Sequence, residues 1–269
     1  MALAATRYRE HAPHPALRAH VRVLWELSGP CDDPSPHRLL PDAAMSLWLN
    51  FGAPFISGTR AVAREGAALI GAIRRPIEVA SVGALDLVGV SFWPGHARVF
   101  FDASVSEVVD RLVAEPPIGT RFASVVDADP GDRIPRLQEV LLRALRPERA
   151  PSGRVLHALS LLDGDEPAPD VVTLARTLGL GTRQLERRFR DELGASPKQL
   201  ASVLRFRRAL DALRAPRPDF AAIAHHCGYA DQSHFVREFA RYARTPPARF
   251  VATDAPRTRG EWLARPRRA

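Results

Sequence analysis

The feature that most constrains the fold is a unit of about fifty residues that occurs twice in the C-terminal part of the sequence. Ala175 and Gly179 lie four residues apart, as do Ala224 and Gly228. The other matched pairs are Leu185 with Phe235, Arg187 with Arg237, Phe189 with Phe239, Pro197 with Pro247, and Leu200 with Phe250. Two copies of one supersecondary unit are hard to explain as chance, so the sequence predicts a repeated structure.

The second copy predicts a helix, a tight turn and a second helix. Gly228 supplies a turn position that needs a flexible backbone, and Asp231 stands where the cap of the next helix is expected. Phe235 and Phe239 lie four apart and share one face toward a core. The opposite face presents Gln232, Ser233, His234 and Arg237. An ordinary helical hairpin fits one such copy equally well, and the repeat favours a helix-turn-helix that reads DNA.

Between the two units, residues 196–213 predict one long helix. Pro197 suits the first helical position after a capping Ser196. Apolar side chains at helical spacing follow at Val203, Phe206, Leu210 and Leu213. A helix of roughly seventeen residues spans about 25 Å, which could hold two reading helices about one DNA turn (roughly 34 Å) apart.

Residues 152–250 resemble the DNA-binding domain of the AraC/XylS family of transcription regulators. The resemblance rests on Leu174-Ala175, Leu178-Gly179, Arg187-Arg188-Phe189, Gly194 with Ser196-Pro197-Lys198, and the run from Gly228 to Phe239. It implies base contacts from Arg183, Glu186, Arg187, Gln232, Ser233 and Arg237. The expected contacts to the DNA backbone are Thr182, Lys198, Arg205, Arg208 and His234.

Two positions depart from the family pattern. Gly181 stands where the family usually has Ser, so the cap of the first reading helix is weaker or moves to Thr182. Arg244 stands where Gly commonly ends the last reading helix, so this C-cap is expected to be strained.

Charge and cysteine content agree with a DNA-binding half. The first 150 residues hold 17 arginines and 17 acidic residues, so the whole formal net charge of +8 lies in residues 151–269. A concentrated positive domain is what phosphate neutralisation requires. The two cysteines are too few for a disulfide framework, and neither a signal peptide nor a membrane-spanning run is evident. These observations predict a cytoplasmic protein without a membrane partner.

The N-terminal half predicts short strands. Apolar residues alternate over 21–27 and 45–51, further strands are expected near 67–73, and segments 77–82 and 85–92 could pair across Gly83-Ala84. This half resembles an uncharacterised sensor-like domain found ahead of AraC-type readers, on the evidence of Tyr8, Trp25, Leu40-Pro41-Asp42, Gly71 and the motif from Gly89 to Gly95. The resemblance implies a cupin-like or related antiparallel β fold.

The predicted fold class is therefore α+β. An antiparallel β barrel or sandwich with a few helices occupies residues 1–148, and an all-α double helix-turn-helix domain occupies 152–252. Residues 253–269 form an Arg/Pro-rich tail.

The sequence offers little evidence of catalysis. His11, His14 and His20 cluster along the chain, and His37 and His96 stand alone, without the spacing of a metal triad. No phosphate-binding loop or nucleophile elbow is present, so no enzyme activity, metal or cofactor is predicted. Trp25, Trp48, Phe92 and Trp93 could line an effector pocket at a barrel mouth, although each fits a packed core as well.

The function predicted from the sequence is a sequence-specific transcription regulator that binds double-stranded DNA through two recognition helices in adjacent major grooves. A small-molecule effector, RNA polymerase and a second copy of the chain are further possible partners. Two alternatives stay open: a constitutive DNA-binding or assembly protein without an effector, and a cupin-like metalloenzyme fused to a DNA reader.

Overall fold

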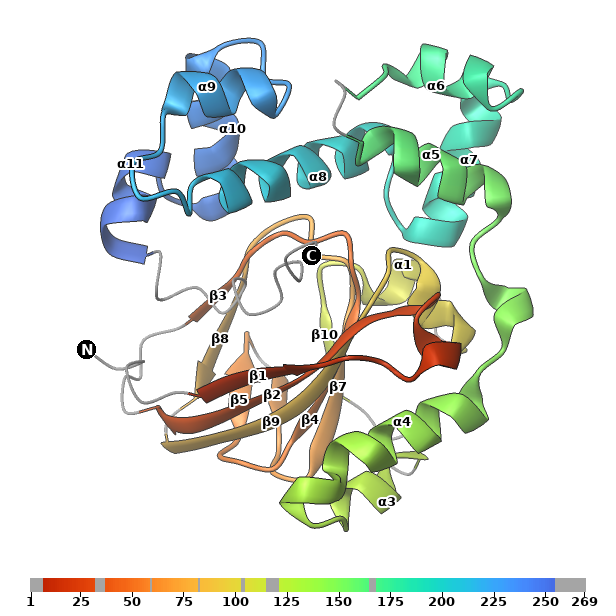
Figure 1. Ribbon diagram of the computed structural model, residues 1–269, viewed down its shortest axis with the longest axis vertical. Helices are drawn as coiled ribbons and strands as arrows, with labels where there is room; N and C mark the ends of the chain where they lie inside the picture. Colours follow the sequence, from red (N-terminus) through yellow and green to blue (C-terminus); the bar gives the residue numbers. More distant parts are fainter. Residues whose placement is uncertain are drawn as a thin grey trace.

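The computed structural model describes residues 7–31, 37–58, 60–81, 83–102, 105–114, 121–164 and 168–254. It has an N-terminal part built on antiparallel sheets and a C-terminal part built of helices (Figure 1), which confirms the α+β class. The predicted tail lies outside the described residues from position 255 onward.

A six-stranded antiparallel sheet forms the centre of the N-terminal part, with the order β1-β2-β9-β4-β7-β10. Its strands are β1 (Arg7–His11), β2 (Val21–Cys31), β4 (Ser46–Asn50), β7 (Gly66–Ile70), β9 (Gly83–Phe92) and β10 (Leu112–Ala114). Because side chains alternate along a strand, β2 sends Val23 and Trp25 to one face and Leu24 to the other. The sheet therefore carries a hydrophobic core on each face.

The second sheet has four strands in the order β3-β8-β5-β6. Its strands are β3 (His37–Leu39), β5 (Phe55–Ser57), β6 (Arg60–Val62) and β8 (Ile77–Ser81). Leu39, Phe55 and Val79 from this sheet share one buried cluster with Trp25 and Trp48 of the first. The core between the two sheets thus combines these aromatic rings with aliphatic side chains of both sheets.

The prediction that residues 77–82 and 85–92 form a hairpin is wrong. β8 pairs with β3 and β5, whereas β9 pairs with β2 and β4. Gly83 has a φ of +118°, a conformation that glycine adopts readily and that lets the chain leave one sheet for the other.

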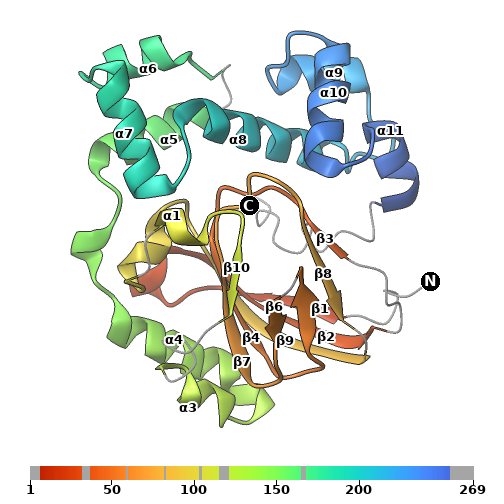
Figure 2. The ribbon, with the colours of Figure 1, turned by 180° about the vertical axis from the view of Figure 1, so that it is seen from behind.

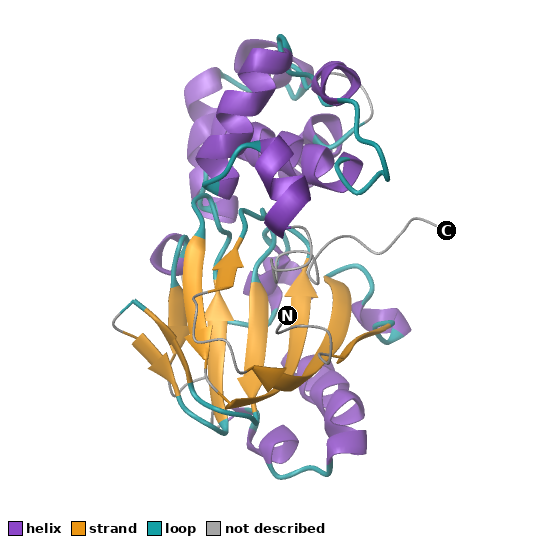
Figure 3. Cartoon of the chain, turned by 90° about the vertical axis from the view of Figure 1, so that its left-hand side faces the viewer, coloured by secondary structure: helices purple, strands orange, loops and turns teal. Residues whose placement is uncertain are grey.

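Several helices between the strands and after them pack on the face of the six-stranded sheet that is turned away from the four-stranded sheet, and short helical turns connect them. They are η1 (Pro15–Leu17), η2 (His96–Val99), α1 (Val105–Val108), α3 (Ala123–Val126), η3 (Pro130–Asp132), α4 (Arg133–Ala144) and η4 (Pro147–Arg149). The apolar stripe of α4, formed by Leu137, Val140 and Leu141, packs into this core. Figure 3 shows α3 and α4 at the end of the sheets opposite the C-terminal helices.

The C-terminal part consists of α5 (Gly153–Leu162), α6 (Val171–Thr177), α7 (Thr182–Leu193), α8 (Pro197–Ala212), α9 (Phe220–His226), α10 (Gln232–Ala243), α11 (Pro247–Arg249) and a π-helical turn, η5 (Phe250–Asp254). The repeat is visible in the lengths, because α6 and α9 have 7 residues each and α7 and α10 have 12. The long helix α8 joins the two units (Figure 1).

The caps explain where these helices begin and end. The Asp231 carboxylate accepts a hydrogen bond from the His234 amide at 2.6 Å, and Ser196 forms a capping box with Gln199. Gly181 provides no side-chain cap for α7, and Arg244 ends α10 with a φ of +59°. Both departures expected from the sequence are therefore present.

Candidate nucleic-acid interface

Helix α7 divides cleanly into a buried and an exposed face. Leu185, Phe189 and Leu193 are buried and recur at intervals of four. Arg183 and Arg187, also four apart, are exposed and therefore lie one above the other on the solvent face. Neither guanidinium makes a hydrogen bond or ion pair with another described residue. Two adjacent cations without an internal partner are available to an external one.

Helix α10 repeats this arrangement. Phe235 and Phe239 are fully buried, while Gln232, Ser233 and Arg237 are exposed. Ser233 and Arg237 are four apart, and Gln232 is the first residue of the helix. Within the described chain, Arg237 also has no ion-pair partner. The six base-contact candidates thus occupy the solvent faces of two matched helices.

Glu186 differs from the other five candidates. Its carboxylate accepts a hydrogen bond from Arg190 Nη2 at 3.0 Å, one turn further along α7. An accepting contact to a base would have to compete with this exposed pair. Because exposed pairs of this kind contribute little, Arg190 holds Glu186 only weakly.

The N-terminal ends of α7 and α10 point away from the β sheets. Figures 1 and 2 show α6 and α9 at the far side of the helical part, and the C-terminal ends of α7 and α10 toward the sheets. Helix N-termini carry a partial positive charge and free amide groups, which favour phosphate. Both helices therefore offer their positive ends to the same side of the molecule.

The residues predicted to contact the DNA backbone do not share one environment. Thr182 and Lys198 are exposed in the first turns of α7 and α8. His234 is half-buried, and its Nδ1 accepts a hydrogen bond from the Ala230 amide at 3.2 Å. Only the first two present a free polar group to solvent.

Arg205 and Arg208 on α8 are engaged inside the protein. Arg205 donates to both carboxylate oxygens of Glu238, with distances of 2.8 to 3.1 Å, and lies over the Tyr229 ring. Arg208 donates to the carbonyl oxygen of Gly164 at 2.7 Å. These contacts tie α8 to α10 and to the end of α5, so the geometry gives both arginines an internal role.

The four aromatic residues expected at an effector pocket do not converge. Trp25 and Trp48 are buried between the two sheets with their ring centroids 5.7 Å apart, and Phe92 is buried on the opposite face of the first sheet. Trp93 instead lies at the boundary of the two parts with 39% of its surface exposed. The four residues therefore line no common cavity.

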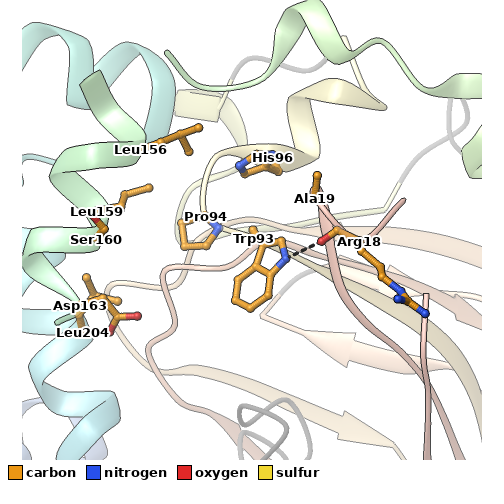
Figure 4. A pocket seen from close by; sticks show the side chains of 10 residues that line it. All are labelled: Arg18, Ala19, Trp93, Pro94, His96, Leu156, Leu159, Ser160, Asp163 and Leu204. Atoms are coloured by element: carbon orange, nitrogen blue, oxygen red, sulfur yellow. Dashed lines mark hydrogen bonds between the residues drawn. The ribbon is translucent and has the colours of Figure 1, made fainter. Parts of the chain in front are cut away.

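A cavity of about 350 Å³ does lie at this boundary (Figure 4). Trp93, Pro94 and His96 form the wall on the β side, and the Trp93 indole donates to the Arg18 carbonyl oxygen at 3.1 Å. The opposite wall comes from α5 and α8 and contains Leu156, Leu159, Ser160, Asp163 and Leu204.

The buried histidines make contacts inside the fold. His20 and His96 face each other with their Nδ1 atoms 2.9 Å apart, and burial lowers the pKa of His96 to about 4. His37 is buried beside Cys31, with 3.5 Å between Nε2 and Sγ. Among the residues that the structure describes, no group of three or more His, Cys, Asp or Glu side chains could hold a metal ion. None of the described helices is long and apolar enough to cross a membrane.

Two family matches divide the chain as the fold does. Residues 174–253 match a family described as a helix-turn-helix domain, and residues 9–114 match a domain of unknown function, DUF6597. The chain is 32% identical over 68 residues to the HTH-type transcriptional activator RhaS of Escherichia coli O157:H7. That match covers 25% of this chain and 24% of RhaS, so the chain spans about a quarter of its curated relative.

Solved structures resemble either the whole chain or its C-terminal part. Apo ToxT from Vibrio cholerae strain SCE256 aligns over 85% of this chain and 97% of its own, with a TM-score of 0.51 and 10% identity. At that identity the likeness shows the fold alone. An AraC-type transcriptional regulator from Chromobacterium violaceum is 26% identical over 38% of this chain and 94% of its own, with a TM-score of 0.34.

Proposed function

We propose that the protein is a sequence-specific DNA-binding transcription regulator of the AraC type, because its C-terminal part matches a helix-turn-helix family and the transcriptional activator RhaS. In this proposal α7 and α10 enter adjacent major grooves from one face of the duplex. The observation that carries it is the matched pair of 12-residue helices with buried apolar faces, whose solvent faces carry Arg183, Arg187 and Arg237 without a partner among the described residues.

The side chains on these faces suit base edges in the major groove. Arg183, Arg187 and Arg237 can each donate two hydrogen bonds to guanine O6 and N7. Gln232 can bond adenine at N6 and N7, and it lies at the start of α10, where a reading helix comes closest to the bases. Ser233 and Glu186 complete the proposed set, with Glu186 accepting from cytosine N4 after leaving Arg190.

Phosphate contacts are assigned to groups that the fold leaves exposed. Thr182 and Lys198 lie in the first turns of two helices, where the helix dipole also favours an anion. Arg205 and Arg208 are left out of this set because their guanidinium groups are bonded to Glu238 and to the Gly164 carbonyl.

The test is a selection of bound sequences from random duplex DNA at two salt concentrations. A bipartite reader is expected to enrich two blocks about one helical turn apart, roughly 10 base pairs. Its affinity is expected to fall steeply with salt because bound phosphates release counterions. Salt-sensitive binding without an enriched motif would show a non-specific DNA binder instead.

Control by a small molecule, which the sequence leaves possible, is here assigned to the cavity at the boundary of the two domains. Its volume of about 350 Å³ falls in the range of ligand sites. The partly exposed side chains of Trp93 and Leu156 contribute apolar surface to its walls. A ligand of this chemistry, apolar with one polar end, would raise the melting temperature of the full chain. Leu156→Asp should abolish that shift, and a constitutive binder would show none in either protein.

The sequence also suggested partners other than DNA and an effector. RNA polymerase, a second copy of the chain and a cytoplasmic location stay predictions. The relative that matches the C-terminal domain is a transcriptional activator, and we expect no enzymatic activity. Metal analysis of the purified protein tests the metalloenzyme alternative, which requires a bound metal ion.

A further inference from the structure

The N-terminal part built on the two sheets (the β domain) contacts the C-terminal end of α7, the first recognition helix, through Arg74. The Asp110 carboxylate accepts a hydrogen bond from Arg74 Nε at 3.0 Å and forms an ion pair with Nη2 at 2.9 Å. The remaining nitrogen, Nη1, donates to the carbonyl oxygen of Gly194 at 3.5 Å, in the left-handed cap of α7. Carbonyl groups in the last turn of a helix lack an intrahelical donor, and a cation there also meets the negative end of the dipole.

Arg38 makes a similar contact with the C-terminal end of α10, the second recognition helix. Its Nη1 donates to the carbonyl oxygen of Ala243, the last residue of α10, at 2.7 Å. This arginine lies in the centre of β3, far from Arg74 in the sequence. Two separate parts of the β domain therefore reach the C-terminal ends of the two repeated helices, at carbonyl groups one repeat position apart.

A third contact joins the β domain to α8. Asp42 Oδ2 lies 3.4 Å from Arg22 Nη2 within the β domain and 3.9 Å from Arg207 Nη2 on α8. The same segment inserts Leu40 and Ala43 into the hydrophobic core of the helical domain. Arg38, Leu40, Asp42 and Ala43 of this one segment thus all contact the helical domain.

Close packing reinforces the contact at α7. A Cβ atom at Gly194 would lie 2.4 Å from Val109 Cγ2, and one at Gly95 would lie 2.6 Å from Leu193 Cδ2. Such separations leave no room for a side chain at either glycine. The end of α7 is therefore seated against α1 and the loop before η2.

The helical domain by itself joins its two units through α8, on which both α7 and α10 pack. A 16-residue helix is about 24 Å long, so a small rotation of one unit about α8 displaces its recognition helix relative to the other. The contacts of Arg74 and Arg38 lie at the ends of those helices, beyond α8. They add to the contacts on α8 itself, such as that of Arg205 with Glu238, in opposing this rotation.

We propose that the β domain fixes the distance and angle between α7 and α10, with Arg38 and Arg74 as positioning residues, and so determines which spacing of two DNA blocks the protein accepts. The inference rests on the proposed DNA-binding function. It assigns spacing specificity to residues that touch no DNA, because the contacts lie at the helix ends opposite those offered to the duplex.

The experiment measures the affinity of the full chain for duplexes that carry the two selected blocks at the selected spacing and at spacings one or two base pairs longer or shorter. Each added base pair moves one block by about 3.4 Å and rotates it by about 34°. The proteins are the wild type, Arg38→Ala, Arg74→Ala, the double variant, and Arg64→Ala as control. Arg64 is an exposed arginine of the β domain, 4.0 Å from Glu65.

The wild type and Arg64→Ala are expected to lose about tenfold or more in affinity on changing the spacing by two base pairs, whereas the double variant should lose less than about threefold. Preferences within each block should be unchanged. Compared with Arg38→Ala, Arg38→Lys should restore the preference for the selected spacing, since one ammonium donor can reach the single carbonyl oxygen of Ala243.

A merely destabilised variant has a smaller active fraction, which lowers apparent affinity for every spacing by the same factor and leaves the ratio unchanged. An unchanged ratio, or tighter binding at all spacings, would overturn the inference while leaving the proposed function intact. A wild type that selects no two-block sequence would overturn both.

Discussion

Asp42→Asn tests whether the buried ionic contact between the domains stabilises the protein. Asp42 lies between two arginines whose side chains are almost inaccessible, with exposures of 6% for Arg22 and 5% for Arg207. Asparagine keeps the shape and the Oδ1 atom that accepts from the Ala44 amide at 2.9 Å, so the substitution removes mainly the charge.

The expected cost follows from the burial of the partners. Removing one member of a buried ion pair typically costs 3–5 kcal/mol because the other charge stays desolvated. Two facts favour the lower end: the nitrogen–oxygen distances are 3.4 and 3.9 Å, and Asp211 also acts on Arg207. We therefore expect a loss of about 3 kcal/mol in the free energy of unfolding at pH 7.

The assay is urea denaturation followed by two probes. Tryptophan fluorescence reports mainly on the β domain, where Trp25 and Trp48 are buried, and far-ultraviolet circular dichroism reports mainly on the helical domain. Separation of the two transitions in the variant would show that Asp42 couples the domains. Asp102→Asn is the matched control, since Asp102 also contacts two arginines, Arg146 and Arg149, but is exposed.

The direction in which the stabilisation by Asp42 changes with pH also follows from its surroundings. Burial alone raises the pKa of Asp42, but the guanidinium groups of Arg22 and Arg207 outweigh it and hold the pKa below its ordinary value. The unfolded chain therefore binds the proton first, and the stabilisation is present above the ordinary aspartate pKa and lost as the pH falls through the folded one. A loss below about 1 kcal/mol at pH 7, or one equal to that of Asp102→Asn, would refute the reasoning.

Three further predictions concern single side chains. Arg244→Gly should stabilise the protein by about 1 kcal/mol in the same denaturation assay, because Arg244 has a φ of +59° that glycine adopts without strain; a destabilised variant would contradict this. The folded pKa of His96 is about 4, below that of an unfolded histidine, so the free energy of unfolding should fall by up to roughly 3 kcal/mol between pH 6.5 and 4. His96→Gln should flatten this dependence in melting curves recorded against pH. In DNA selection, Gln232→Ala should relax preference at one base position, whereas Lys198→Ala should weaken all sequences alike and reduce the salt slope by about 1; equal effects of both would refute the assignment of base reading to Gln232.

The helical half was predictable because its signals are local. Asp231, Gly228 and the apolar stripe at Phe235 and Phe239 act within one or two turns of the chain, and the structure confirms the cap, the turn and the buried face. The repeat doubled each of these signals. Strand positions near Val21 and Ser46 were predictable for the same reason, since alternation is a property of a few consecutive residues.

Strand partners were not predictable in this way. Segments 77–82 and 85–92 are neighbours in the sequence, yet they belong to different sheets, because pairing depends on burial against residues that lie far away along the chain. Trp25 and Phe92 likewise lie on opposite faces of one sheet. Because both faces are buried, the neighbouring residues alone could not show which face each ring would take.

The sequence by itself determined the repeated helix-turn-helix and the placement of the positive charge, because caps, glycine turns and helical periodicity are written within a few residues. Only the tertiary structure decided which arginines are free. Arg187 and Arg205 look alike in the sequence, yet Arg205 meets Glu238 from a distant helix and Arg187 meets no partner within the described chain. An arginine's role depends on which carboxylate or carbonyl group the fold brings within about 3 Å of it.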